Sequence, residues 1–140
     1  MINFFSEQTK SPRLNKKKIT FLIKCIALDF QKKVGNISII FTNDEYLLEI
    51  NKKYLNHDYY TDIITFNYNE ENVVSGDLFI SLDRIKENSI LQNQAFDEEV
   101  IRIIIHGFLH LNEINDKSVK EKTEMTKFEN LYLEKYKELI

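Results

Sequence analysis

The sequence predicts a mixed α+β fold in which a small four-stranded sheet is covered by about five helices. Two observations predict it. Short runs rich in β-branched and aromatic residues, such as 37–41 and 62–68, indicate strands. Longer segments between them repeat apolar residues at the spacing of an amphipathic helix. The chain of 140 residues carries no repeat or linker and is long enough for one sizeable core, so we expect a single domain over residues 1–140.

The first half of the chain alternates between these two kinds of segment. Residues 2–5 predict a short strand, and residues 14–30 predict an amphipathic helix with a lysine-rich outer face. The Gly-Asn pair at 35–36 breaks the helix, and the β-branched run 37–41 predicts a second strand. A helix over 44–54 follows, because two acidic residues occupy its first turn, where the helix dipole favours negative charge.

The second half begins with two strands, at 62–68 and 76–82, which are close enough in sequence to pair as a hairpin. Three further helices are expected, over residues 83–93, 100–111 and 118–139. The last of these opens with Ser118 and Glu121, which have the spacing of a capping box.

The helix expected at 100–111 carries a single polar stripe. Its surface is Val, Ile, Phe and Leu almost all round, so we expect it to be buried. Three strongly polar side chains, Arg102, His106 and His110, interrupt it at intervals of four residues and therefore share one face. Asp116 follows six residues after His110, beyond the polar residues that end the helix. The pattern H-x3-H-x5-D predicts three metal ligands, two on a helix and one just after it.

This pattern also indicates the chemistry. One histidine on an apolar helix is usually a hydrogen-bonded core residue, whereas two at this spacing can reach one ion. Two histidines and a carboxylate leave one coordination position open, as in catalytic zinc sites, and they also suit iron(II). Water bound to zinc ionises near neutral pH, so hydrolysis is the expected reaction. Gly107 stands where metalloproteases of the H-E-x-x-H type carry a general base, which argues against peptide hydrolysis.

A glycine inside a helix also costs stability relative to alanine. Gly107 therefore indicates either that a large group approaches the backbone there or that the helix packs closely on its neighbour.

Composition sets limits on the partners. The net charge of −3 does not indicate a general polyanion binder, although residues 10–33 hold eight Lys or Arg against one acid. That segment is either a surface that attracts nucleic acid or a solvated helix face. A single cysteine, Cys25, excludes an internal disulfide. No segment reaches 18 apolar residues and the first 30 residues lack a signal-peptide pattern, so we expect no membrane contact and a cytoplasmic location.

Four segments resemble one known family. H-G-F-L-H-L at 106–111 resembles the opening of the H-G-x-L-H-L-x-G-Y-D-H signature of the YbeY family, bacterial metal-dependent endoribonucleases of ribosomal RNA maturation. T-D-I-I-T-F at 61–66 and G-D-L-F-I-S at 76–81 are similar to two strands of that family. Met125 and Glu129 fit an M-x3-E feature in its last helix. The order and intervals agree, so the resemblance extends over most of the chain.

The resemblance implies a zincin-like active-site helix and one zinc ion held by His106, His110 and Asp116. It implies that water bound to the metal attacks a phosphodiester of single-stranded RNA in the cytoplasm, during ribosomal RNA maturation. Ribosomal RNA and the small ribosomal subunit are the implied partners. A non-catalytic ribosome-assembly factor that binds RNA or a ribosomal protein is the alternative, and a metal-dependent hydrolase of another substrate is a third.

Three positions depart from the family pattern. Asp116 stands where the family has its third histidine, and a carboxylate remains a competent zinc ligand. Glu113 stands where the family has a glycine, so we expect Asn112 or Asn115 to take the left-handed conformation of the turn. Leu55 stands where the family usually has an arginine implicated in activity, so the phosphate contact inferred from that arginine is not carried over.

Several other residues keep two interpretations. Arg102 either contacts an RNA phosphate or pairs with an acid such as Asp62 or Asp77. Asp62 and Ser81 either orient metal ligands or make structural hydrogen bonds. His57 is either a site residue or a surface histidine. Three tyrosines either stack on unpaired bases or cover a sheet edge or the core. They are Tyr54, Tyr59 and Tyr60.

Overall fold

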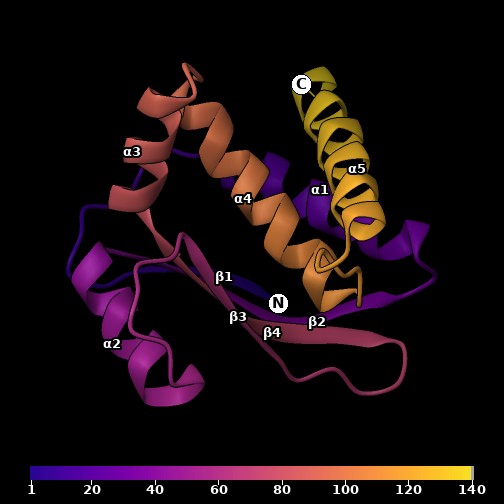
Figure 1. Cartoon of the computed structure of the whole chain (residues 1–140). Coiled ribbons are helices and arrows are strands. Elements are labelled where there is room, and N and C mark those ends of the chain that lie inside the picture. Colours follow the sequence, from indigo (N-terminus) through magenta and orange to yellow (C-terminus); the bar gives the residue numbers. More distant parts are fainter. Residues whose placement is uncertain (140) are drawn as a thin grey trace.

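The computed structural model describes residues 1–139 and confirms the predicted class, because a four-stranded sheet packs with five helices in this part of the chain (Figure 1). The elements, in chain order, are β1 (Ile2–Ser6), α1 (Lys16–Asp29), β2 (Lys33–Thr42), α2 (Asp44–Leu55), β3 (Ile63–Asn67), β4 (Val73–Ser81), α3 (Leu82–Leu91), α4 (Phe96–Leu111) and α5 (Val119–Glu138).

The sheet is mixed, with the strand order β1-β2-β4-β3. β1 and β4 both run parallel to β2, whereas β3 runs antiparallel to β4. The predicted hairpin is therefore confirmed, and its register pairs Ile63 with Ile80 and Asn67 with Gly76. This register places alternate residues of the hairpin on opposite faces of the sheet.

Helices cover both faces of the sheet (Figure 1). α1 and α4 pack on one face with α5 against them, and α2 packs on the other face. The strand residues under α1 and α4 form the centre of the core, and five of them are completely buried: Ile37, Ile39, Val74, Leu78 and Ile80. Burying each such side chain contributes about 1.5–3 kcal/mol.

α4 is buried nearly all round, as the sequence predicts. Six of its apolar side chains are at most 1% exposed: Val100, Ile104, Ile105, Phe108, Leu109 and Leu111. Its first turn carries Asp97, Glu98 and Glu99, where the positive end of the helix dipole favours acids. The histidine stripe therefore belongs to a helix whose position is determined by core packing.

Two glycines let α4 lie unusually close to the β3–β4 hairpin. A Cβ atom on Gly107 would lie 2.6 Å from Cδ1 of Ile63 and 3.0 Å from Cδ2 of Leu78. A Cβ atom on Gly76 would lie 2.8 Å from Cδ2 of Leu111 and would collide with a backbone carbonyl of β3. Of the two explanations for Gly107, the structure therefore supports close packing of the helix.

Two strands begin earlier than the sequence predicts. β2 starts at Lys33, four residues before the expected Ile37, and β4 starts at Val73, three residues before Gly76. Gly35 and its neighbour lie inside β2, where the pairing with β4 shifts register. A β-bulge leaves one residue unpaired, so a glycine there marks an irregular strand and not a loop.

α4 ends in a Schellman motif, a pair of backbone hydrogen bonds that closes a helix C-terminus. The amide of Glu113 donates to the carbonyl of His110 at 2.9 Å, and the amide of Ile114 donates to the carbonyl of Leu109 at 3.1 Å. This motif needs a left-handed residue at the first position after the cap, and that residue is Glu113, with φ of 68°.

The expectation that Asn112 or Asn115 makes this turn is wrong. Asn112 is the helix cap, with φ of −88°, and Asn115 is not among the residues with positive φ. The buried side-chain amide of Asn112 donates to the carbonyl of Phe108 at 2.8 Å. The helix length decides which residue follows the cap, and this outweighs the local preference of asparagine for left-handed backbone.

Replacing Glu113 by glycine should raise the free energy of unfolding by about 1 kcal/mol. A left-handed residue with a side chain costs roughly 1–2 kcal/mol, and the greater freedom of glycine in the unfolded chain cancels part of the gain. The 4.0 Å ion pair between Glu113 and Lys32 is largely exposed on the glutamate side and contributes little. Urea unfolding measures the change. Asn115→Gly is the matched control and should not stabilise, and a less stable Glu113→Gly protein would contradict the argument.

Candidate metal centre

The polar stripe of α4 faces a cleft at the edge of the sheet. His106 and His110 lie one turn apart, with side chains 19% and 24% exposed. Their rings are 4.5 Å apart between centroids and nearly perpendicular, at 83°. This arrangement turns the Nε2 atoms of both rings toward each other, to a distance of 3.0 Å.

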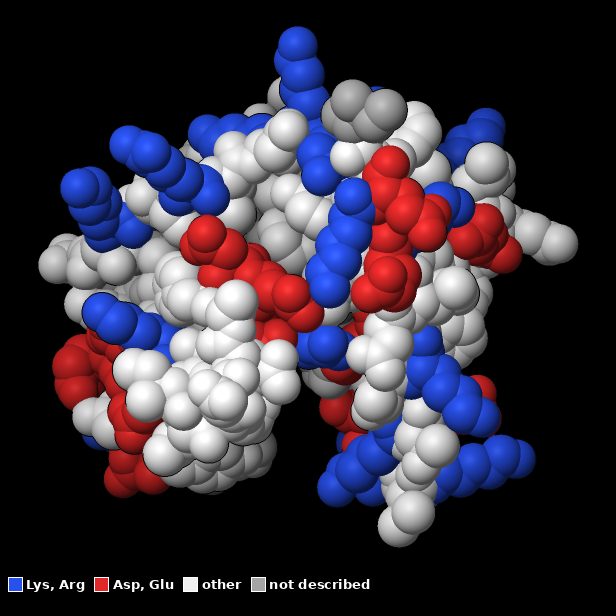
Figure 2. Space-filling view, turned by 90° about the horizontal axis from the view of Figure 1, so that it is seen from above, with Lys and Arg blue, Asp and Glu red and all other residues white. Residues whose placement is uncertain are grey.

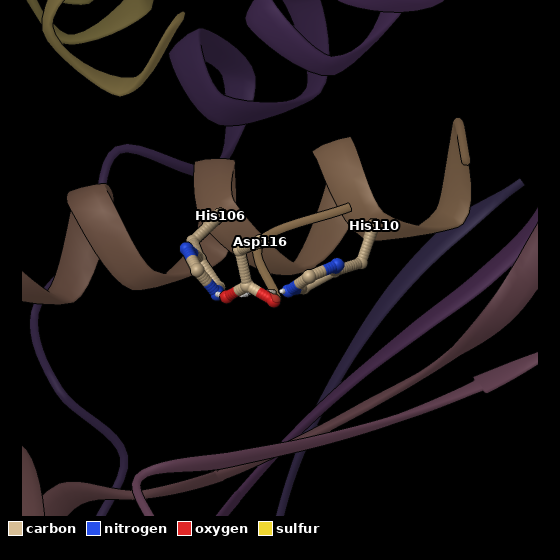
Figure 3. A group of neighbouring side chains, drawn as sticks. All are labelled: His106, His110 and Asp116. Carbon is tan, nitrogen blue, oxygen red and sulfur yellow. Dashed lines mark hydrogen bonds and ion pairs between the residues drawn. The ribbon is translucent and has the colours of Figure 1, made fainter. Parts of the chain in front are cut away.

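The loop after α4 brings Asp116 to the two histidines, as the sequence predicts (Figure 3). Its Oδ2 atom lies 3.4 Å from Nε2 of His106 and 3.3 Å from Nε2 of His110. One ligand atom from each of the three residues therefore converges on one small volume.

The spacing of these three atoms suits a tetrahedral ion. Zinc binds nitrogen and oxygen at about 2.0–2.1 Å, and two ligand atoms on a tetrahedron of that size are about 3.3 Å apart. The three separations measured between the donor atoms are 3.0, 3.3 and 3.4 Å. Three protein donors leave a fourth position open, and two imidazoles with one carboxylate also suit iron(II). The donor set therefore fits a divalent cation.

Glu129 orients one of the histidines from α5. Its Oε2 atom lies 2.6 Å from Nδ1 of His106, and its side chain is only 12% exposed. A carboxylate on Nδ1 holds the proton at that nitrogen and leaves Nε2 free to bind an ion. α5 begins at the predicted capping box of Ser118 and Glu121, both halves of which are formed. In the sequence Glu129 shows only a family resemblance and no role, because its contact with His106 depends on how α5 packs against α4.

The surroundings of His106 raise its pKa above the ordinary value. Burial acts in the opposite direction and is the largest single influence, but it is outweighed by the hydrogen bond and charge of Glu129, together with the charges of Asp116 and Asp62. Negative groups around an imidazole favour its cationic form, and they favour a bound metal cation by the same attraction.

Arg102, the first member of the stripe, is held in ion pairs between the two helices. Its guanidinium donates to Glu99 at 3.1 Å and to Asn130 at 2.9 Å, and it lies 3.5 Å from Glu129. An ion pair was one of the two interpretations, although its acids are not the expected Asp62 or Asp77. Arg102 pairs instead with Glu99, one helical turn away on α4, and with Glu129 on α5, which packs alongside. Arg102 therefore keeps Glu129 in place, and Glu129 in turn orients His106.

Asp62 and Ser81 have different roles. Asp62 precedes β3, borders the cleft beside His106, and has a raised pKa because burial penalises its charged form. Ser81 is a structural residue, because its hydroxyl donates to Asp44 at 2.7 Å and accepts from the amide of Arg84 at 3.2 Å, capping α3. Of the two residues, only Asp62 remains a candidate to act on the site.

The cleft beside these three candidate ligands has a volume of about 500 Å³. His106, His110 and Asp116 line it. The end of α2, the connection after it and β3 also line it, with Leu55, His57, Tyr59 and Thr61 among their residues. The site is therefore open to an extended ligand.

Charge is mixed on the face that carries the N-terminal end of α4. Figure 2 shows acidic side chains near the middle of this face and at its left margin, with lysines and arginines between them and around the edge. Two lysines of α1 lie over aromatic rings, Lys18 at 4.3 Å from the ring of Tyr136 and Lys16 at 5.5 Å from that of Phe4.

Within residues 1–139, no helix combines the length and apolar character needed to cross a bilayer.

The fold and the donor set define a class: an α+β protein in which a buried helix presents two histidines, joined by an acidic side chain, at an open cleft. The family described as Endoribonuclease YbeY matches residues 2–137, and the chain belongs to this family. The resemblance noted in the sequence is therefore confirmed.

Individual relatives agree with this assignment. Endoribonuclease YbeY of Bacteroides fragilis is 50% identical over 129 residues, which are 92% of this chain and 93% of that protein. Endoribonuclease YbeY of Porphyromonas gingivalis strain W83 is 41% identical over 99% of this chain and 92% of its own length. The solution structure of TM1509 from Thermotoga maritima shares the fold, with a TM-score of 0.68 and 24% identity, covering 97% of this chain and 89% of that one.

Replacing Glu129 by glutamine should weaken zinc binding by about 10- to 100-fold, the usual cost of losing a carboxylate that orients a metal-binding histidine. Titration against a chelating zinc dye measures the affinity. Glu134→Gln is the matched control, because Glu134 lies exposed on the same helix and pairs only with Lys137 among the described residues. Equal zinc affinities for the two variants would show that Glu129 does not act through His106.

Replacing Asp62 by asparagine should stabilise the metal-free protein at neutral pH. Because burial raises the folded-state pKa of Asp62 above its ordinary 3.8, ionisation costs stability as the pH rises above that value. The variant has no such cost, so its advantage should be absent in acid and grow toward neutrality. Urea unfolding from about pH 4 to pH 7 tests this, with the exposed Asp58→Asn as control. A constant difference across that range would contradict the burial argument.

Proposed function

We propose that this chain is a zinc-dependent endoribonuclease that cuts single-stranded RNA during ribosomal RNA maturation, and that residues 1–140 form one metal-dependent hydrolase domain. The observation that carries the proposal is the convergence of His106, His110 and Asp116 at an open cleft. Membership of the Endoribonuclease YbeY family supplies the reaction, because the curated relatives bear that name.

The residues divide the work of holding the ion. His106, His110 and Asp116 would bind it, and Glu129 would keep Nε2 of His106 turned toward it. When bound, a divalent cation supplies Lewis acidity and lowers the pKa of water. Zinc fits the donor set best, and iron(II) is the alternative. Asp62 is the other carboxylate, besides Asp116, among the residues that line the cleft, and it is the candidate for moving a proton.

The site lacks the peptidase arrangement. Gly107 occupies the position of the glutamate in H-E-x-x-H enzymes, and its close contacts with Ile63 and Leu78 leave no room for a side chain. A phosphodiester is therefore a better substrate for this centre than a peptide. Activity in ribosomal RNA maturation would place the protein in the cytoplasm, with the small ribosomal subunit as its partner.

The second candidate is a non-catalytic ribosome-assembly factor. It is favoured by Leu55, which is 42% exposed and lines the cleft where the family usually has an arginine. It is also favoured by Asp116, which replaces the family's third histidine. Under this alternative the cleft binds RNA or a ribosomal protein, and loss of the metal leaves binding unchanged.

Replacing His110 by alanine should remove stoichiometric zinc and lower the cleavage of single-stranded RNA by more than about 100-fold, because a direct ligand matters more than a residue that orients one. Elemental analysis and a gel assay with nuclease-free protein measure the two effects. Thr126→Ala, on the exposed face of α5, is the control.

Equal cleavage by the His110→Ala protein would identify a contaminating nuclease. Absence of cleavage in the unmutated zinc-loaded protein, with co-sedimentation on small ribosomal subunits that survives His110→Ala, would establish the assembly factor instead.

A further inference from the structure

The cleft that His106, His110 and Asp116 line also carries a stacked pair of rings. His57 and Tyr59 lie face to face, with centroids 5.0 Å apart and planes inclined by 21°. The hydroxyl of Tyr59 lies 2.9 Å from Nδ1 of His57, which holds the two rings together at their edge. Both side chains are exposed, and that of Tyr59 is 56% accessible.

The backbone under this pair is held in place by one buried residue. Asn51 is 1% exposed, its side-chain amide donates to the carbonyl of Tyr59 at 2.9 Å, and its carbonyl accepts from the amide of His57 at 3.1 Å. Asn56, directly before His57, makes the left-handed turn that ends α2. The rings are therefore presented by an ordered connection, so a ligand that binds them does not have to order the loop first.

The three tyrosines that had the same two interpretations in the sequence make different contacts in the structure. Tyr54 packs edge-on against Phe66, at 5.6 Å between centroids, and so covers the sheet. The hydroxyl of Tyr60 donates to Glu45 at 2.5 Å, and its ring lies against the guanidinium of Arg84 at 5.1 Å. Tyr59 has only His57 as a ring partner among the described residues.

The part of the cleft that carries the pair has Leu55 where the family usually has an arginine, so no positive side chain is available there for a phosphate. Leu55, His57, Tyr59 and Thr61 line the same cleft as His106, His110 and Asp116, and no lysine or arginine is among the described residues that line it. A strand whose phosphate lies at the metal ligands must continue over one rim of this cleft. Aromatic rings bind unpaired bases of any sequence by stacking, which contributes about 1–3 kcal/mol per base.

We propose that His57 and Tyr59 form a stacking platform for an unpaired RNA base beside the cleavage site, a role that rests on the proposed function. The platform positions the RNA strand by stacking, at a place where Leu55 cannot contact a phosphate as an arginine would. It favours single-stranded RNA over duplex, because a paired base has both faces covered by its neighbours and cannot stack on a side chain.

The test measures binding separately from cleavage. Zinc-loaded protein is titrated with single-stranded oligoribonucleotides whose phosphorothioate linkages resist hydrolysis, and fluorescence anisotropy gives the dissociation constant. Tyr59→Ala should raise it about 5- to 150-fold, which is 1–3 kcal/mol. Tyr59→Phe keeps the ring and should stay within about threefold, since it loses one exposed hydrogen bond. Tyr68→Ala is the control, because Tyr68 is 57% exposed and lies outside the cleft, bonded to Asp77.

A second arm locates the base. A series of oligonucleotides carries one abasic nucleotide, at a different position in each. The unmutated protein should bind one member of the series more weakly than the others, and the Tyr59→Ala protein should bind all members about equally. The platform is overturned if Tyr59→Ala binds as the unmutated protein does, or if the abasic profile is the same in both. Cleavage of ordinary RNA by the unmutated protein is scored independently, so a protein that binds through the platform but does not cut refutes only the proposed function.

Discussion

The close approach of α4 to the β3–β4 hairpin is the constraint on which the rest of the structure depends. Gly107 on the helix accommodates Leu78 and Ile63, and Gly76 on the strand accommodates Leu111. Each element thus fits a side chain of the other into a space that a Cβ atom would fill. The helix cannot slide or rotate without opening these contacts, so its two histidines stay at one place above the sheet edge.

Much of this could be predicted from the sequence, because the relevant information is local. Helical spacing identified α4 as buried, and the same spacing placed His106 and His110 on one face with Asp116 within reach. The start of β2 was missed because Gly35 lies at a bulge, which depends on pairing with β4. The part played by Glu129 was missed for a similar reason, since it depends on how α5 packs against α4.

The cleft concentrates negative charge around its two histidines. Asp116 and Glu129 contact them, and Asp62 lies half-buried in the same cleft with a raised pKa. Arg102 offsets part of this charge but lies on the Glu129 side. Repulsion between these carboxylates costs stability, as is common at functional sites, and a bound divalent cation would reduce that repulsion.

The Schellman motif that ends α4 has a consequence for the coordination number of the site. His106 and His110 are fixed by the helix and offer one nitrogen each, whereas Asp116 lies beyond the turn on a short connection to α5. A carboxylate can bind through one oxygen or two, and an imidazole cannot. With aspartate in place of a third histidine, the three side chains would offer an ion one or two carboxylate oxygens without movement of the helices.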